Sequence, residues 1–278
     1  MSKQYSKMAT EISGDVIAIG DVHGYLDSVK DLFRQFEENI PDFENTWVVF
    51  LGDYSDRGPN SKETLEFLVD LWKNRPKTTF LMGNHDLAFS LFLGLLELPK
   101  NYDYEPHKSH LKTREKKVEI PQTDNMPLQG LRYPIAYSAQ NTFKSYGAKF
   151  GNNKELNEIV SEDVKQFYRS LPWIINHPKY NFVHGGFSKE MTYEENIEQL
   201  ERRDLTLIRP VWLCERNLKK APKDAKKIIV SGHVSYPEVQ FLTNRILVDT
   251  TGGYNKYISA VHLPTNKVFR AFPNEQNN

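Results

Sequence analysis

Short apolar runs that each stop at a glycine are the feature of this sequence that most constrains its fold. Three of them occur in the first third of the chain, at residues 16–19, 47–51 and 78–82. Two stretches between these runs carry apolar side chains at helical spacing, namely residues 25–38 and 61–72. Ser61 is the expected N-cap of the second helix. Strands that alternate with helices in this way predict a parallel sheet with right-handed crossovers, and therefore an α/β fold.

The second half of the chain repeats this pattern less regularly. Further strands are predicted at residues 181–183, 227–230, 245–248 and 257–263. Between the two halves, residues 100–134 are polar, contain proline and lack a clear period, so we expect a surface insertion there. No repeat or low-complexity tract divides the chain, and we expect residues 1–278 to form a single domain that carries this insertion.

Balanced charge excludes partners that are found by bulk electrostatics. The chain has 36 Lys and Arg residues and 36 Asp and Glu residues, so its formal net charge is zero. Neither nucleic acid nor an anionic membrane surface is therefore an expected partner. The longest apolar run, residues 87–96, is too short to span a bilayer. Because Cys214 is the single cysteine, no intrachain disulfide can form, and we expect a cytoplasmic protein.

Five polar clusters lie where the predicted strands end. They comprise Asp21 and His23; Asp53, Asp56 and Arg57; Asn84, His85 and Asp86; His184; and His233. Ligands of open α/β sheets bind beyond the carboxyl ends of the strands, so these clusters should meet in one crevice. Glycines accompany every cluster, which allows sharp turns and a close approach of the backbone to a bound group.

The ligand types in these clusters are carboxylate, imidazole and amide, without a thiolate. A mixed nitrogen and oxygen set of this kind suits manganese, iron or zinc better than calcium, and it differs from a cysteine-rich structural zinc site. Six candidate ligands exceed the need of one tetrahedral ion, whereas two ions that share a bridging carboxylate would use them all. Two such ions lower the pKa of a shared water toward about 7 and neutralise phosphoryl oxygens, which favours attack on a phosphate ester.

The ordered motifs resemble those of calcineurin-like metallophosphoesterases. They are GDVHG at residues 20–24, GDYSDRG at 52–58, GNHD at 83–86, HGG at 184–186 and GH at 232–233. The second motif and the HGG motif are similar to the phosphoprotein phosphatase (PPP) superfamily. Residues 86–99, 141–151 and 230–253 are similar to its Rhizobiales-like branch. The resemblance implies a four-layer α/β/β/α sandwich with two mixed β-sheets and a dinuclear site at the loop edge.

The resemblance also implies a role for each motif residue. Six of them would be metal ligands: Asp21 and His23 on the first ion, Asp53 between both ions, and Asn84, His184 and His233 on the second. His85 would be the general acid for the leaving oxygen, Asp56 would orient its imidazole, and Arg57 would bind phosphate. Elementary chemistry agrees, because a leaving alkoxide needs a proton and a planar guanidinium binds phosphate through two hydrogen bonds.

Two positions depart from the family pattern. Asp86 stands where the eukaryotic Ser/Thr members have Glu, and the shorter carboxylate also occurs in the Rhizobiales-like branch. A second phosphate-binding arginine is expected between the fourth and fifth motifs. Arg216 is the candidate for this substrate-binding role, with Arg203 and Arg209 as alternatives.

The expected reaction is hydrolysis of a phosphomonoester by dimetal-bound hydroxide, with manganese as the first choice of metal and iron or zinc as alternatives. The resemblance implies a phosphoprotein or phosphopeptide substrate, with phosphotyrosine favoured. Two other functions stay open: a bis(5'-nucleosyl)-tetraphosphatase, which the same metals would serve, and a catalytically silent scaffold. A cysteinyl-phosphate mechanism is not expected, because Lys220 follows Cys214 at the sixth position, where such enzymes carry arginine.

Overall fold

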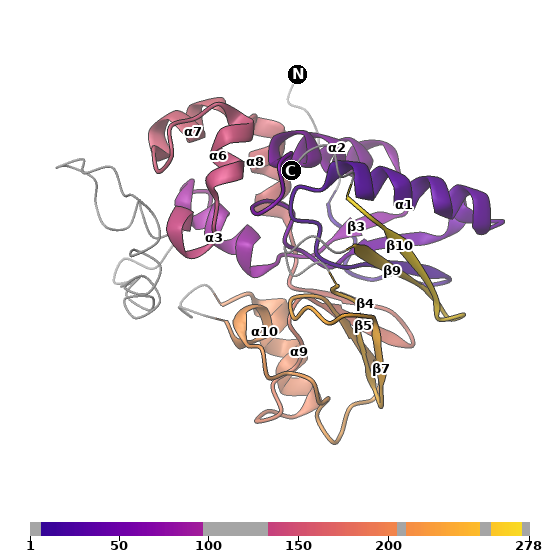
Figure 1. Cartoon of the computed structure of the whole chain (residues 1–278). Helices are drawn as coiled ribbons and strands as arrows, with labels where there is room; N and C mark the ends of the chain where they lie inside the picture. Colours follow the sequence, from indigo (N-terminus) through magenta and orange to yellow (C-terminus); the bar gives the residue numbers. More distant parts are fainter. Residues whose placement is uncertain (1–6, 97–132, 205–209, 251–256, 274–278) are drawn as a thin grey trace.

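The computed structural model of the chain describes residues 7–96, 133–204, 210–250 and 257–273 (Figure 1). The predicted insertion at residues 100–134 therefore lies outside the described residues, except for its last two positions. The first of these, Tyr133, is buried, so the end of this segment belongs to the protein interior.

The first sheet has five strands in the order β10-β9-β1-β2-β3. Their bounds are Val16–Ile19 for β1, Trp47–Phe50 for β2, Thr78–Phe80 for β3, Ile258–Leu263 for β9 and Lys267–Ala271 for β10. β1, β2 and β3 are parallel, whereas β9 pairs antiparallel with both β1 and β10. The predicted parallel crossovers of the first third are confirmed, and two antiparallel strands from the end of the chain complete a mixed sheet.

The second sheet also has five strands, in the order β4-β5-β6-β8-β7. Their bounds are Ile174–Asn176 for β4, Tyr180–Val183 for β5, Ile228–Ser231 for β6, Gln240–Leu242 for β7 and Arg245–Leu247 for β8. β5, β6 and β8 are parallel, and β4 and β7 pair antiparallel at the two edges. Both sheets are mixed, as the motif resemblance implied.

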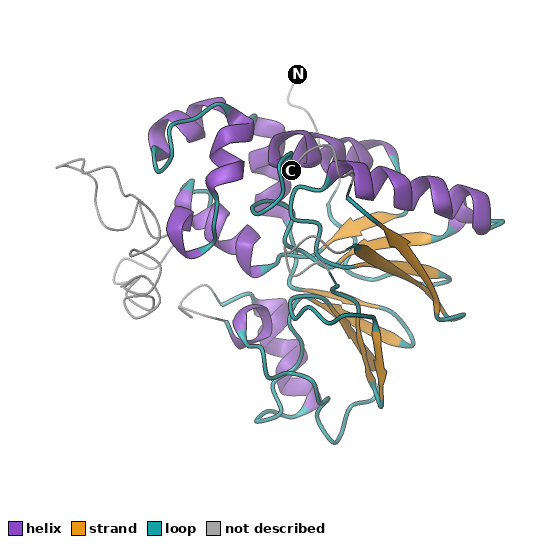
Figure 2. Cartoon of the chain, viewed as in Figure 1, coloured by secondary structure: helices purple, strands orange, loops and turns teal. Residues whose placement is uncertain are grey.

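Helices cover the outer faces of the two sheets (Figure 2). The helices are α1 (Leu26–Asn39), η1 (Phe43–Asn45), α2 (Ser61–Asn74), α3 (Asn84–Phe92), α6 (Gln140–Tyr146), α7 (Asn153–Ile159), α8 (Glu162–Ser170), α9 (Tyr193–Arg202) and α10 (Val211–Cys214). α1 and α2 lie over the first sheet, and α9 and α10 lie beside the second (Figure 1). Among the described residues, no helix is long and apolar enough to cross a membrane.

The N-cap predicted for α2 was wrong by one position. The helix begins at Ser61, and Asn60 occupies the cap without a side-chain capping bond. The Ser61 hydroxyl instead accepts a hydrogen bond from the Asp56 amide at 3.2 Å. A serine in the first turn can satisfy a loop amide as readily as a helix amide, and the sequence does not distinguish the two.

Alternating strand residues build two separate cores. Val16 and Ala18 of β1 belong to the apolar cluster between the sheets, together with Phe182 of β5. Ile17 and Ile19 belong to the second cluster, which includes the buried faces of the helices. Because successive side chains of a strand point to opposite faces, a fully apolar strand is buried on both sides. The result is the predicted four-layer α/β/β/α sandwich.

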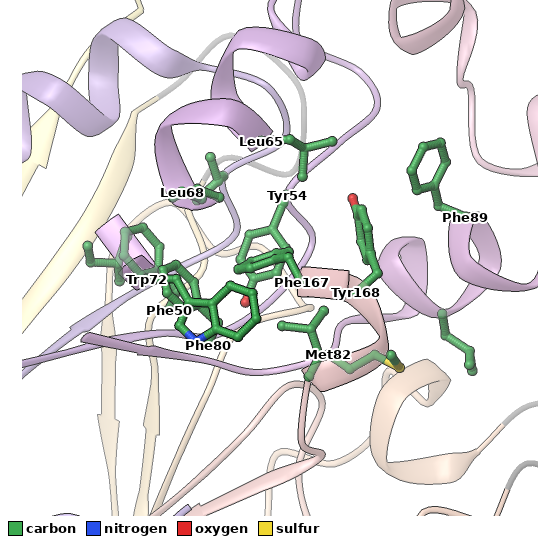
Figure 3. Packing of buried hydrophobic residues seen from close by; sticks show 14 of the residues in the cluster. Phe50, Tyr54, Leu65, Leu68, Trp72, Phe80, Met82, Phe89, Phe167 and Tyr168 are labelled. Carbon is green, nitrogen blue, oxygen red and sulfur yellow. The ribbon is translucent and has the colours of Figure 1, made fainter. Parts of the chain in front are cut away.

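Aromatic side chains hold α2 and α8 on the outer face of the first sheet (Figure 3). The rings of Phe50 and Phe80 stack with 4.8 Å between their centroids, and Phe167 of α8 meets Phe80 edge-on at 5.0 Å. Leu65 and Leu68 of α2 belong to the same cluster. Burial of one such side chain stabilises the fold by about 1.5–3 kcal/mol, so this packing fixes the strands whose ends carry the motifs.

The carboxyl ends of the parallel strands of both sheets meet at one edge of the sandwich. The Val22 amide, after β1, donates to the Asp53 carbonyl, after β2, at 3.1 Å. A ring nitrogen of His184, after β5, contacts the Leu51 carbonyl of the other sheet at 2.8 Å. The Gly232 amide, after β6, donates to the His184 carbonyl at 2.9 Å. The predicted clusters therefore share one crevice edge that spans both sheets.

Candidate metal centre

Asp53 lies in the middle of the six predicted ligands. On one side, His23 Nε2 is 3.7 Å from Asp53 Oδ2 and 3.8 Å from Asp21 Oδ2. On the other side, His184 Nε2 is 3.5 Å from Asp53 Oδ1 and 3.0 Å from Asn84 Oδ1. One carboxylate thus faces two groups of predicted ligands, with one oxygen toward each.

His233, which follows β6 of the second sheet, lies beside His184. Its ring centroid is 5.0 Å from that of His184, and its amide donates to Asp21 Oδ1 at 3.0 Å. Two overlapping sets of three possible ligand atoms result, each within 4.8 Å: His23, Asp53 and His85, and Asp53, His184 and His233. All six predicted ligands lie in this cluster, and Asp53 is common to both sets.

Backbone carbonyls orient the two buried imidazoles. The Nδ1 of His23 contacts the Ser55 carbonyl at 3.0 Å, and the Nδ1 of His184 contacts that of Leu51 at 2.8 Å. A carbonyl only accepts, so each Nδ1 carries the proton and each Nε2 presents a lone pair to the carboxylates. Burial lowers the pKa of both histidines well below the ordinary value, which keeps them neutral as metal binding requires.

The chemistry of the donor set in this cluster fits a bound cation. His23 Nε2 is fully buried and has no hydrogen-bond partner among the described residues. Burial raises the pKa of Asp21 and Asp53 well above the ordinary value, and neighbouring carboxylates, including Asp249, raise it further. The positive charge of Arg57 acts in the other direction and lowers the pKa of both carboxylates. A divalent cation would offset this crowding and use the Nε2 lone pair, so the donor set fits manganese, iron or zinc.

Five of the ten predicted site residues have a left-handed backbone. The φ angles are 45° at His23, 55° at Asp53, 71° at Asp56, 63° at Arg57 and 68° at His233. Residues with a Cβ avoid this region, and each such conformation costs on the order of 1–3 kcal/mol. The surrounding contacts therefore hold these side chains against a local preference, as is typical of functional sites.

Two glycines make room for the predicted ligands. A Cβ on Gly83 would overlap Asp53 Oδ1, and a Cβ on Gly232 would overlap Asp21 Oδ1. The amide of His85, in the first turn of α3, donates to the same Asp53 oxygen at 2.9 Å. The glycine thus allows the carboxylate to approach the positive end of a helix.

Asp86 has a role that the sequence did not indicate. Its carboxylate accepts hydrogen bonds from three backbone amides, at 2.6 Å from Asp53, 3.0 Å from Tyr54 and 2.8 Å from Gly83. Burial raises its pKa to about 7, although these three amides lower it. Asp86 therefore ties the loop after β2 to the loop after β3, which places Asp53 beside Asn84.

The predicted general acid and its partner are in direct contact. His85 Nδ1 lies 2.7 Å from Asp56 Oδ2, and His85 Nε2 lies 3.2 Å from a guanidinium nitrogen of Arg57. A guanidinium only donates, so Nε2 is the acceptor here and Nδ1 carries the ring proton toward Asp56. His85 also reaches the cluster, with Nε2 4.0 Å from Asp53 Oδ2.

Asp56 makes two further contacts that were not predicted from the sequence. Its Oδ1 accepts hydrogen bonds from the hydroxyls of Tyr133 and Thr142, both at 2.7 Å. Burial raises the pKa of Asp56 to about 7, and these two hydroxyls and Arg57 lower it. Neither residue belongs to the five motifs. Thr142 lies in the 141–151 segment that resembles the Rhizobiales-like branch, but no sequence pattern connects either hydroxyl with Asp56.

Two of the three candidates for a second phosphate-binding arginine, Arg203 and Arg216, lie in the described part of the chain. Arg216 is exposed after α10, and within the described part of the chain no hydrogen bond or ion pair joins it to the six ligands. Arg203 donates to the Leu171 carbonyl at 2.7 Å and lines a separate cavity of about 460 Å³ with Lys7 and Trp173. Arg209 lies outside the described residues. The role of Arg216 stays a prediction.

A two-sheet sandwich with overlapping ligand sets at its loop edge is typical of metal-dependent phosphoesterases. Comparison with known families agrees, since residues 14–256 match the model of the calcineurin-like phosphoesterase family. The chain belongs to this family.

Individual relatives include two different types of enzyme. The chain is 42% identical over 77 residues to a catalytic subunit of protein phosphatase 2A from Dictyostelium discoideum, which covers 27% of this chain and 23% of that protein. It is 27% identical over 182 residues to the symmetrical bis(5'-nucleosyl)-tetraphosphatase of Actinobacillus pleuropneumoniae serotype 3 (strain JL03), covering 64% and 47%. The match thus spans less than half the length of either relative.

A solved structure supports the fold. The cold-active protein-tyrosine phosphatase of a psychrophilic Shewanella superposes with a TM-score of 0.58 over 96% of this chain and 81% of that one. The two sequences are 20% identical, so the likeness concerns the architecture alone.

Proposed function

We propose that this chain hydrolyses phosphomonoesters of phosphoproteins with the help of two divalent metal ions. The observation that carries the proposal is the contact of His85 with Asp56 at 2.7 Å, directly beside Asp53 and Arg57. Metal ligands alone would suit a structural ion, whereas an adjacent imidazole with a carboxylate partner supplies a proton donor for a leaving group.

The ligands would divide between the two ions in the way that the motifs imply. Asp21 and His23 would hold the first ion, Asn84, His184 and His233 the second, and Asp53 would contribute one oxygen to each. When bound, the ions supply an activated water and neutralise the oxygens of the phosphoryl group. Manganese is proposed first, with iron or zinc as alternatives.

Three side chains of the loops after β2 and β3 would bind the phosphate and donate a proton to the leaving group. Arg57 donates to His85 Nε2 in this structure. A phosphate oxygen is a stronger acceptor for a guanidinium than an imidazole is, so substrate would draw Arg57 away and leave Nε2 facing the leaving oxygen. Released from Arg57, Nε2 would first take up a proton from solvent and then deliver it to the leaving oxygen, while Asp56 stabilises the cationic imidazole through Nδ1.

A phosphoprotein is the proposed substrate, with phosphotyrosine preferred. The Dictyostelium relative, a protein phosphatase, shares 42% of residues over the matched segment, which supports a protein substrate. The preference for phosphotyrosine follows from the likeness of three segments to the Rhizobiales-like branch. Arg216 is proposed as a second contact to the substrate.

Dinucleoside polyphosphates are the second candidate substrate. The observation that favours them is the match to the Actinobacillus tetraphosphatase, which extends over 64% of this chain. The same ligands and the same general acid would serve cleavage of a phosphoanhydride, since the leaving phosphate also needs charge neutralisation.

We also propose that residues 1–278 form one domain. The ligands come from both sheets, with Asp53 from the first and His184 and His233 from the second, so neither sheet alone would hold two ions. Limited proteolysis that leaves a compact fragment with both sheets would support this.

A panel of phosphotyrosine, phosphoserine and phosphothreonine peptides and diadenosine tetraphosphate tests the function. With manganese, we expect fastest turnover on phosphotyrosine peptide, and a slowing of about 10²–10⁴ in His85→Asn, the usual contribution of a general acid. Bound metal, measured by mass spectrometry, should be unchanged in this variant. Faster turnover of the dinucleotide would select the second candidate, and no metal-dependent turnover would indicate a silent scaffold.

A further inference from the structure

The two carboxylate oxygens of Asp56 contact different side chains. Oδ2 faces His85 Nδ1, and Oδ1 accepts from the hydroxyls of Tyr133 and Thr142. The side chain is fully buried, so no solvent competes for either oxygen. Two donors on one oxygen prevent the carboxylate from rotating about its Cβ–Cγ bond, and the other oxygen is thereby held toward the imidazole.

Thr142 belongs to a small network of hydroxyls at the start of α2. Its hydroxyl also accepts from the Asp56 amide at 3.0 Å and lies 3.1 Å from the Ser61 hydroxyl. Since Thr142 gives its one proton to the Asp56 carboxylate, Ser61 is the donor of the bond between the two hydroxyls. Thr142 therefore holds both the backbone and the side chain of Asp56, at a residue whose φ is 71°.

Aromatic packing holds the Tyr133 ring in place. Its ring is 2% exposed and contacts Phe92 at 5.1 Å, Phe89 at 5.7 Å and Tyr137 at 5.9 Å between centroids. Tyr137 in turn meets the His85 ring edge-on at 4.8 Å. The segment after residue 132 thus contacts both Asp56 and His85.

We propose that Tyr133 and Thr142 are positioning residues for proton donation by His85, and that they act through Asp56. They touch neither the ligand cluster nor the reacting atoms, so their effect depends on the His85 ring being correctly turned. This inference rests on the proposed function, because it assigns these residues to the same proton transfer. It extends the catalytic unit to residues outside the five motifs.

Leaving-group dependence separates a positioning role from a structural one. Phenyl phosphate has a poor leaving group that needs a proton, whereas p-nitrophenyl phosphate has a good one that hardly does. We expect Tyr133→Phe and Thr142→Val each to slow phenyl phosphate about tenfold, the change expected for one hydrogen bond to a charged group. Their effect on p-nitrophenyl phosphate should stay below about threefold. Equal losses on both substrates would overturn the proposal.

Matched controls remove hydroxyls that have no hydrogen-bond partner among the described residues. Tyr146→Phe on α6 and Thr64→Val on α2 make the same chemical changes at buried positions. In both controls, the ratio of the turnover rates of phenyl phosphate and p-nitrophenyl phosphate should keep the wild-type value. A shift of that ratio in the controls as large as in the test variants would count against the proposal.

Coupling to His85 provides the second arm. In a His85→Asn background, Tyr133→Phe and Thr142→Val should cause no further loss on phenyl phosphate, because they act through the missing group. An undiminished tenfold loss there would overturn the proposal. If the wild type showed no metal-dependent turnover of phenyl phosphate, the proposed function would fail instead, so the two failures are distinct.

A readout independent of turnover uses the metal-free protein. The ring ¹⁵N NMR spectrum of the histidines should contain the resonance of a protonated, hydrogen-bonded Nδ1. This resonance should be absent in His85→Asn, which assigns it to His85. Thr142→Val and Tyr133→Phe should shift this resonance, whereas Tyr146→Phe and Thr64→Val should not. A resonance unmoved in both test variants, with unfolding temperatures showing that they are folded, would overturn the proposal.

Discussion

The two sheets contribute different chemistry to their shared edge. The loops of the first sheet carry the charged groups, with Asp21 and Asp53 in the ligand cluster and Asp56, His85 and Arg57 beside it. The loops of the second sheet carry His184 and His233. One half therefore combines candidate ligands with the proton donor, and the other half adds neutral ligands.

The second difference is the way each half is held. A backbone carbonyl orients His184, and its neighbour His233 is half-buried. Asp53 instead depends on a close glycine, on a helix amide and on Asp86, which holds its backbone amide. Carboxylates are more costly to bury than neutral imidazoles, so the first half needs the denser set of partners. Changes in the first sheet's loops should therefore have the larger effects.

The largest effect is expected for Asp53→Asn. An amide has one oxygen and less charge, so it would bind neither ion strongly, and metal-dependent turnover should be abolished with metal content falling for both ions. Metal analysis of the purified protein together with a turnover assay checks this. Retention of two ions per chain would show that Asp53 is not the shared ligand.

His233→Asn should remove one ion rather than two. His233 lies in the second of the overlapping sets and outside the first. Affinity for one ion should drop by more than the roughly 10–100-fold seen when groups one step away from a metal are changed. Titration with manganese measures both affinities, and His262→Asn, in β9, is the control that should keep both. Loss of both ions would contradict the prediction that a ligand of the second sheet affects only one of them.

Gly83→Ala tests the close approach of the backbone to Asp53. The new methyl group would overlap Asp53 Oδ1, and overpacking of this kind costs about 1–3 kcal/mol. Metal affinity and unfolding free energy should both fall. The control is Gly94→Ala, where φ is +67° and, its chain neighbours aside, no atom of the described residues lies within 4 Å of the added Cβ. This change should cost about 1 kcal/mol of stability and leave metal binding intact. Unchanged metal affinity in Gly83→Ala would show that Asp53 adjusts freely.

The smallest effect concerns Asp56 and pH in the metal-free protein. Burial holds the pKa of Asp56 at about 7 in the folded chain, above the ordinary 3.8. Between these values the folded chain keeps a proton that the unfolded chain has lost, so stability falls as pH rises through this window. The unfolding free energy of the wild type minus that of Asp56→Asn should therefore decrease from about pH 4 to about pH 7 and then level off. Urea denaturation measures it, and a difference that grows with pH would contradict the assignment.

Much of the site could be predicted because its residues follow strands directly. Asp21, Asp53 and His184 come within three residues of a strand end, and parallel strands bring such positions to one edge. The spacing within GDYSDRG and GNHD also placed Asp56 beside His85 through the resemblance. By contrast, β4, β7 and β10 were not predicted. These strands of three to five residues do not stop at a glycine, the signal that marked the equally short edge strand β3.

Contacts between distant segments could not be predicted. Tyr133 and Thr142 reach Asp56 across 77 and 86 positions of sequence, and Asp86 binds the Asp53 amide across 33. A hydroxyl or a carboxylate on a helix has the same local pattern whether it faces solvent or a buried partner. Ser61 shows the same limit at short range, since its hydroxyl serves a loop amide rather than a helix amide.

The sequence by itself determined the alternating strands and helices of the first third, the ligand types and the family, because these depend on local periodicity and on the chemistry of residues close together in the chain. The tertiary structure decided that one oxygen of Asp53 faces each ligand group, that Asp86 anchors the loop that carries it, and that two hydroxyls hold Asp56 toward His85. The physical reason is that burial makes each charged oxygen require partners, and the folded chain supplies them from whichever segment lies nearest in space.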